Sequence, residues 1–190
     1  MDNNLKIISF LGKNIGKSYT MHELSRLLKI PYATFHRTIA QMADLVLAER
    51  FGNSMALRIN PANPVIKSYL AIASEDEKKE YLKNQPIIRK IASETSTKDI
   101  MLLFGSYAKH TQAEKSDIDL LIINKDGKRT LPFSKYELLF KKKINPIFIT
   151  KKEFKLMLKD KEENVGKQAL KNHIILNNPY LFWETVLDGI

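Results

Sequence analysis

The chain has 190 residues, of which 31 are Lys or Arg and 21 are Asp or Glu, and its formal net charge is +10. The absence of cysteine excludes disulfides and thiolate metal sites, and a hydrophobic content of 44% favours packed cores over disorder. No apolar run reaches the roughly 20 residues of a membrane span, and the N-terminus lacks the apolar core of a signal peptide. We therefore expect a cytoplasmic protein of two small domains, without membrane contact, whose charge favours polyanionic partners.

The first third of the sequence has the pattern of three helices followed by a β-hairpin. Apolar periodicity, capping residues and β-type runs define these elements. The predicted elements are a helix over 5–12, a helix that begins after Thr20, a helix that begins at Pro31, and strands over 46–51 and 55–60. This order is typical of a winged helix-turn-helix domain, which we predict for residues 1–62.

The rest of the sequence predicts a helical connector and then an alternation of helices and strands. Pro61 and Pro64 mark the boundary, and residues 63–85 form the connector. The predicted elements of residues 86–190 are a helix over 86–93, strands over 100–104, 117–123 and 144–150, a helix over 133–142, and helices from there to the C-terminus. The expected fold class is α+β, with a mixed β-sheet flanked by helices in this second domain.

Two short motifs carry the strongest functional signal. The apolar run 100–104 leads into Gly105, which lets a ligand approach the backbone, and then into Ser106 at a helix start, where free N–H groups favour phosphate. Asp117 and Asp119 stand two apart in the next strand, so they share one face. Paired carboxylates repel each other unless a cation lies between them, and oxygen ligands suit Mg²⁺. These pieces together predict nucleotidyl transfer from a phosphate donor.

A known superfamily has similar motifs. The stretch 86–176 resembles the DNA polymerase beta-like nucleotidyltransferases, above all the minimal members of archaea and bacteria. The resemblance is carried by Gly105-Ser106-Tyr107-Ala108-Lys109 followed by Ser116-Asp117-Ile118-Asp119. It implies that Gly105, Ser106 and Lys109 bind a nucleoside triphosphate such as ATP. It also implies that Asp117 and Asp119 are catalytic residues that bind Mg²⁺.

The sequence departs from the family pattern at two positions. His110 stands where the family usually has glycine, and Asn145 stands where active members have a third carboxylate. An amide cannot act as a base near neutral pH. Glu153 is a substitute only if the fold brings it near, so nucleotide and metal binding are expected ahead of efficient catalysis.

The third predicted helix has an apolar face and a polar face. Phe35, Ile39 and Met42 recur at helical spacing and face inward. The candidate DNA-binding residues are Tyr32, Thr34, His36, Arg37 and Gln41 on the helix, and Arg50, Asn53 and Arg58 on or beside the wing. The stretch also resembles winged-helix regulators, which implies double-stranded DNA as a partner. A winged helix used for protein contacts is the alternative, because residues 1–62 carry only eight Lys and Arg against four Asp and Glu.

These signals leave three functions open. The first is a DNA-binding regulator whose second domain holds a nucleotide and Mg²⁺. The second is an active transferase that moves a nucleoside monophosphate onto a protein or small-molecule hydroxyl. The third is a scaffold with neither activity. A homodimer is expected because winged helices often pair on palindromic sites.

Overall fold

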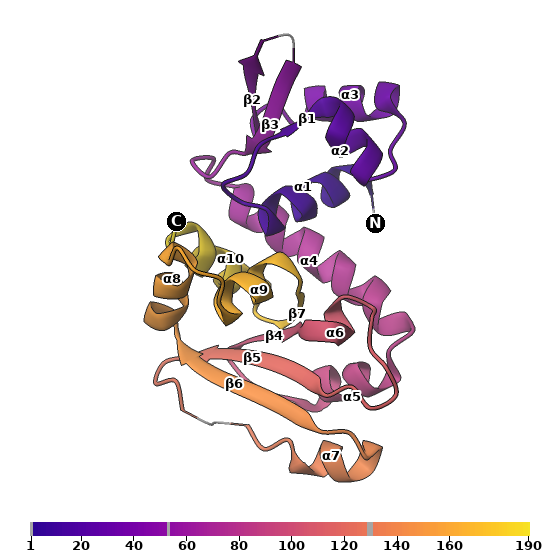
Figure 1. The fold of residues 1–190 in the computed structure, drawn as a ribbon, viewed down its shortest axis with the longest axis vertical. Coiled ribbons are helices and arrows are strands. Elements are labelled where there is room, and N and C mark those ends of the chain that lie inside the picture. Colours follow the sequence, from indigo (N-terminus) through magenta and orange to yellow (C-terminus); the bar gives the residue numbers. More distant parts are fainter. Residues whose placement is uncertain (1, 53, 129–130) are drawn as a thin grey trace. The chain divides into compact units, whose positions relative to one another are not determined.

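The computed structural model describes residues 2–52, 54–128 and 131–190 (Figure 1). They divide into two compact units, Met1–Ala73 and Ser74–Ile190. The border falls within helix α4 (Ile66–Lys83), so the segment 63–85, predicted as a connector, contributes residues to both units. Within the described ranges, no helix combines the length and the apolar character that crossing a bilayer requires.

Besides the start of α4, the described residues of the first unit form three helices and a small antiparallel sheet. Its elements are α1 (Asn3–Lys13), β1 (Tyr19–Thr20), α2 (Met21–Leu27), α3 (Tyr32–Gln41), β2 (Val46–Phe51) and β3 (Ser54–Ile59). The helices and the hairpin are confirmed, and the Thr20 hydroxyl caps α2 by accepting the Glu23 N–H at 3.2 Å. Strand β1, which pairs with β3, was not predicted because two residues are too short to show an alternation.

Apolar side chains from every helix of the first unit fill its core. Ile8 of α1, Leu24 of α2, Phe35 of α3 and Leu57 of β3 are fully buried. Phe35 and Ile39 both face this core, as their helical spacing predicts, and the opposite face of α3 is therefore left to solvent.

The second unit is built on a four-stranded mixed sheet in the order β6-β5-β4-β7. Besides the end of α4, its elements are α5 (Pro86–Glu94), β4 (Ile100–Phe104), α6 (Gly105–Ala108), β5 (Ile118–Asn124), α7 (Ser134–Phe140), β6 (Ile144–Thr150), α8 (Lys151–Lys159), α9 (Val165–Lys171), β7 (Ile174–Asn177) and α10 (Pro179–Leu187). Strand β4 is antiparallel to both β5 and β7, whereas β5 and β6 are parallel. The predicted mixed sheet flanked by helices is confirmed.

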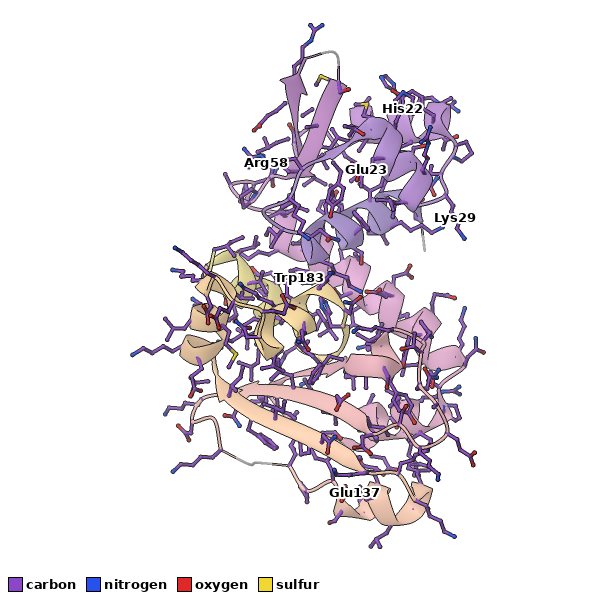
Figure 2. The ribbon with its side chains drawn as sticks, in the orientation of Figure 1. His22, Glu23, Lys29, Arg58, Glu137 and Trp183 are labelled. Atoms are coloured by element: carbon purple, nitrogen blue, oxygen red, sulfur yellow. The ribbon has the colours of Figure 1, made fainter. Side chains whose placement is uncertain are left out.

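Both faces of this sheet are covered. Ile118, Leu120 and Ile122 of β5 point to one face and pack with side chains of α4, α5 and α7. Leu121 points to the other face, where helices α8, α9 and α10 lie in Figure 1. Trp183 of α10 is buried there, and its Nε1–H donates to the Ser74 hydroxyl at 2.9 Å (Figure 2). Central strands buried on both faces are a rigid support for groups at their ends.

The prediction of helices alone after residue 150 is wrong. Residues Ile174–Asn177 form β7, which pairs with β4. His173 lies between α9 and β7, where its buried Nδ1 bonds the carbonyls of Ala169 and Leu170 at 2.8 and 2.9 Å. Periodicity failed here because an apolar run of about four residues fits a buried strand and a helix turn equally well.

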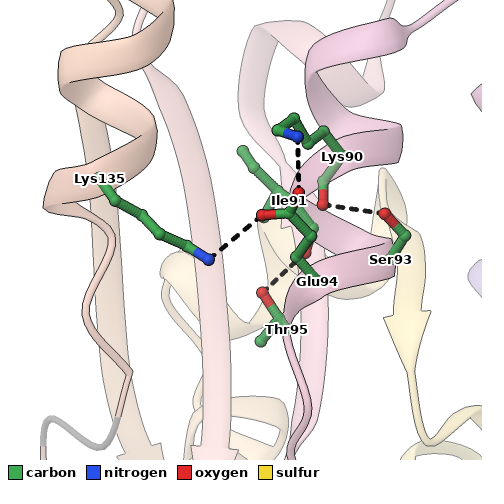
Figure 3. Close-up of polar contacts among 6 residues, drawn as sticks. All are labelled: Lys90, Ile91, Ser93, Glu94, Thr95 and Lys135. Atoms are coloured by element: carbon green, nitrogen blue, oxygen red, sulfur yellow. Dashed lines mark hydrogen bonds and ion pairs between the residues drawn. The ribbon is translucent and has the colours of Figure 1, made fainter.

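Helices α5 and α7 are tied together at the surface. Glu94 pairs with Lys90 of α5 at 2.6 Å and with Lys135 of α7 at 3.2 Å (Figure 3). The hydrogen bond from Lys90, followed by that from Lys135, holds the pKa of Glu94 below its usual range. All three side chains are solvent-exposed, so the link positions α7 more than it stabilises the fold.

Candidate functional site

The sheet register places the acidic pair beside Asn145. Asp119 of β5 stands opposite Phe104 of β4 on one side and opposite Asn145 of β6 on the other. Asp117 lies directly before β5 and not within it, so the strand begins one residue later than the predicted 117–123. Ile118 is fully buried on the opposite side, so both carboxylates leave the core on the same face.

The two carboxylates converge on one amide group. Asn145 Nδ2 donates to Asp117 Oδ2 at 3.1 Å and to Asp119 Oδ1 at 3.3 Å. Lys143 adds an exposed ion pair, with its Nζ 3.6 Å from Asp117 Oδ2. The amide hydrogens and the lysine charge together reduce the repulsion between the two carboxylates. Neither Asn145 as a bridging donor nor Lys143 was predicted, because the pairing of β6 with β5 is not visible in the sequence.

Gly105 is required by both its backbone and its surroundings. Its φ is +69°, in the left-handed region that favours glycine. A Cβ placed on Gly105 would lie 2.1 Å from Asp119 Oδ2, far closer than two non-bonded atoms allow. The absence of a side chain therefore lets the turn of α6 lie directly against the acidic pair.

Ser106 and Lys109 follow in the same turn. Among the described residues, the Ser106 hydroxyl has no hydrogen-bond partner, whereas its carbonyl accepts the Thr111 N–H at 3.0 Å. Ser106 is half-buried and Lys109 is exposed, so the hydroxyl and the ammonium group are both open to a ligand. The structure brings Gly105, Ser106, Asp117 and Asp119 together.

A buried tyrosine holds this turn in place. The Tyr81 hydroxyl of α4 donates to the Tyr107 carbonyl at 2.9 Å, and burial raises the pKa of Tyr81 well above its usual range, so the donor stays protonated. His110 then adopts a φ of +56°, and its ring lies 5.1 Å from that of Tyr81. This left-handed conformation explains why glycine is the usual residue at position 110, and the Tyr81 ring gives the imidazole a contact in return.

Glu153 does not replace the missing third carboxylate. Its Oε2 accepts the Thr150 N–H at 2.7 Å and the Thr150 hydroxyl at 2.8 Å, in the capping box that begins α8. These bonds, led by the one from the Thr150 backbone, hold the pKa of Glu153 below its usual range. Thr150 pairs with Asn124 at the far end of β5, about 16 Å along the strand from Asp119.

The donor set fits a hydrated Mg²⁺ ion. Asp117 and Asp119 offer oxygens that meet at one point, and both residues are half-buried, so water and phosphate oxygens have access to the remaining coordination positions. In the described part of the chain, no cluster of three or more His, Cys, Asp or Glu is arranged to hold a metal. Water or phosphate oxygens would complete the coordination of an ion held by the two aspartates.

The first unit presents most of the candidate DNA-binding residues to solvent. Of those on α3, Tyr32, His36, Arg37 and Gln41 are exposed and Thr34 is half-buried. The Tyr32 ring stacks on His22 of α2 with centroids 4.2 Å apart, a contact between two helices that the sequence did not predict.

The hairpin candidates differ in their surroundings. Arg50 Nε donates to the Gly52 carbonyl at 3.3 Å, and Arg58 pairs with Glu49 at 2.6 Å (Figure 2). Asn53 lies outside the described residues. The Glu49 carboxylate offsets part of the charge of Arg58. Because the ion pair is exposed to solvent, it is weak.

Gly105→Ala should lower the free energy of unfolding by about 1–3 kcal/mol beyond the loss caused by Gly16→Ala. Both glycines have positive φ, but a Cβ on Gly16 meets no atom within 4 Å, so the excess isolates the contact with Asp119. Urea unfolding measures it. In an Asp119→Ala background the excess should shrink, and an equal cost in both backgrounds would contradict the close approach.

A family model described as Polymerase beta, Nucleotidyltransferase matches residues 86–180. No curated protein and no solved structure matches the chain. The matched region covers half of the 190 residues and includes β4, α6, β5 and β6, the elements that assemble the acidic pair and the Gly105 turn. The chain therefore belongs to the polymerase beta nucleotidyltransferase family.

Proposed function

We propose that the second unit binds a nucleoside triphosphate together with Mg²⁺. Asp117 and Asp119 hold the metal, while Gly105, Ser106 and Lys109 contact the phosphates. The observation that carries this proposal is the convergence of both carboxylates on one point beside the Gly105 turn. Nucleotidyltransferases generally act on nucleoside triphosphates with Mg²⁺, which agrees with this assignment.

The same site accounts for slow nucleotidyl transfer. In such a transfer an acceptor hydroxyl forms a bond to the α-phosphorus, pyrophosphate leaves, and the hydroxyl proton passes to a base. Bound Mg²⁺ would supply positive charge that offsets the charge on the phosphates. Asn145 holds the position of the expected base but has no basic lone pair at neutral pH, so the proton must leave through solvent. The acceptor is a protein or small-molecule hydroxyl.

Binding of ATP at the acidic pair should require Mg²⁺, and Asp119→Asn should weaken this Mg²⁺-dependent binding by about 100-fold or more, because the amide keeps the shape of the side chain and removes its charge. Isothermal titration calorimetry with and without Mg²⁺ measures both effects. Asp44→Asn changes the charge equally on an exposed residue of the first unit and should leave affinity unchanged. ATP binding by the Asp119 variant that is still tightened by Mg²⁺ as in the unmodified protein would refute the assignment.

Asn145→Asp should raise the release of pyrophosphate from ATP and Mg²⁺ by about 100-fold, the lower end of what a positioned base contributes. A coupled assay for pyrophosphate, run beside transfer of label from the α-phosphate, gives the rate. Glu153→Gln is the control, and it should neither raise nor lower the rate. A loss of activity in the Glu153 variant would show that Glu153, and not the residue at position 145, acts as the base.

We further propose that the first unit is a winged helix that binds double-stranded DNA, which would make the protein a nucleotide-holding regulator. Support comes from the element order of three helices and a hairpin and from the exposed polar face of α3. Arg37 and Gln41 suit guanine and adenine edges, and Tyr32 and Thr34 suit phosphates. His36, Arg50, Asn53 and Arg58 are assigned to the same interface. A homodimer on a palindromic site stays a prediction.

Arg37→Ala should weaken binding to a selected DNA duplex by about tenfold or more, since a base contact contributes about 1–3 kcal/mol. Fluorescence anisotropy at two salt concentrations provides the readout. Lys6→Ala removes one exposed charge from α1 of the same unit and should have a smaller effect. Binding that ignores both salt and the Arg37 substitution would exclude recognition by α3.

A further inference from the structure

The second unit has a pocket of about 540 Å³ at the end of the sheet away from the acidic pair. Asn124 and Thr150, which pair where β5 and β6 end, both line it. About 16 Å of β5 separates this end from Asp119. Because of this separation, the pocket is distinct from the proposed nucleotide site. Its volume lies in the range of small-molecule pockets.

Four lysines line this pocket: Lys98, Lys125, Lys151 and Lys152. None of their ammonium groups forms an ion pair with any described residue. Asp99 also lines the pocket and offsets one of the four charges. Like charges on three separate segments repel one another, and an anion bound between them would remove that repulsion.

The segments that carry these lysines are held by side-chain hydrogen bonds. Asn178 Nδ2 donates to the Lys98 carbonyl, which fixes the backbone just before β4. Asn124 Nδ2 donates to the Lys128 carbonyl at 2.8 Å and closes the turn that begins with Lys125. The capping box fixes the first turn of α8. The cationic lining is therefore built on ordered backbone, which limits the entropy lost when a ligand binds.

The remaining lining favours a phosphate attached to an apolar group. Helix α8 has nine residues, and its capping box uses the backbone N–H of Glu153. The backbone N–H groups of Lys151 and Lys152 at the start of α8 form no hydrogen bond to a described residue, so they can donate to a phosphate. Ile123 and Leu181 supply apolar wall beside these donors.

We propose that this pocket binds a small organic phosphate, of the chemical class of a nucleoside di- or triphosphate, without a divalent cation. The lysine ammonium groups neutralise the phosphates, and the apolar wall receives the base. This site is independent of Asp117 and Asp119, and it adds a second nucleotide-class ligand to the one assigned above.

Titration of the full chain with ADP in EDTA, monitored by calorimetry and ¹⁵N NMR, tests the proposal. One ADP should bind per chain, shift the amide signals of Asn124 and Leu181, and bind more weakly as salt is raised. The double substitution Lys151→Ala/Lys152→Ala should weaken ADP binding by about tenfold or more. The control Lys159→Ala/Lys161→Ala makes the same charge change outside the pocket and should leave ADP binding unchanged. If the first pair unfolds the chain, Lys98→Ala/Lys125→Ala replaces it.

Three results would overturn the proposal. One is equal weakening by both lysine pairs, which would mean nonspecific attraction. Another is loss of metal-free ADP binding in Asp119→Asn, which would place the ligand at the acidic pair. The third is binding of pyrophosphate as tight as that of ADP, which would remove the role of the apolar wall. Failure of Mg²⁺-dependent ATP binding alone would count against the proposed nucleotide site and leave this pocket standing.

Discussion

The parallel pairing of β5 with β6 controls the chemistry of the second unit. It sets Asp119 opposite Asn145, and the Asn145 amide then draws the carboxylate of Asp117 to the same point. A slip of one residue would turn Asp119 to the face that Ile118 and Leu120 fill, and burial of a carboxylate in that apolar core is costly, so the register is strongly fixed. Gly105, which directly follows β4, completes the site, because any side chain at this position would collide with Asp119.

Much of this was predictable because the relevant patterns are local. Apolar runs located β4, β5 and β6, and the Gly105 and Asp117–Asp119 motifs located the site. Two short strands, β1 and β7, were not predicted, since runs of two and four residues carry too little periodicity and form only by pairing with distant strands. The position of Glu153 was equally hidden: the sequence places it soon after Asn145, yet the length of β6 puts it at the opposite end of the sheet.

The two ends of the β5–β6 pair differ in charge and in the ligand chemistry that they suit. One end presents carboxylates beside a glycine turn and requires a cation before it accepts phosphate. The other presents lysines and open helix N–H groups, which accept phosphate directly. A protein with both would respond to nucleotides in two ways, one dependent on Mg²⁺ and one not. In the regulator proposed above, the exposed polar face of α3 would be the surface that contacts DNA.

The function proposed for the second unit requires that Asp117 and Asp119 share one divalent ion beside the Gly105 turn. Paramagnetic broadening of ¹⁵N NMR signals by Mn²⁺, added to the full chain with ATP, tests it most directly. We expect selective loss of the Gly105, Asp119 and Asn145 signals and their recovery with excess Mg²⁺, while the Thr150 signal at the far end of β6 is broadened much less. Broadening centred on Thr150, or none that depends on ATP, would contradict it.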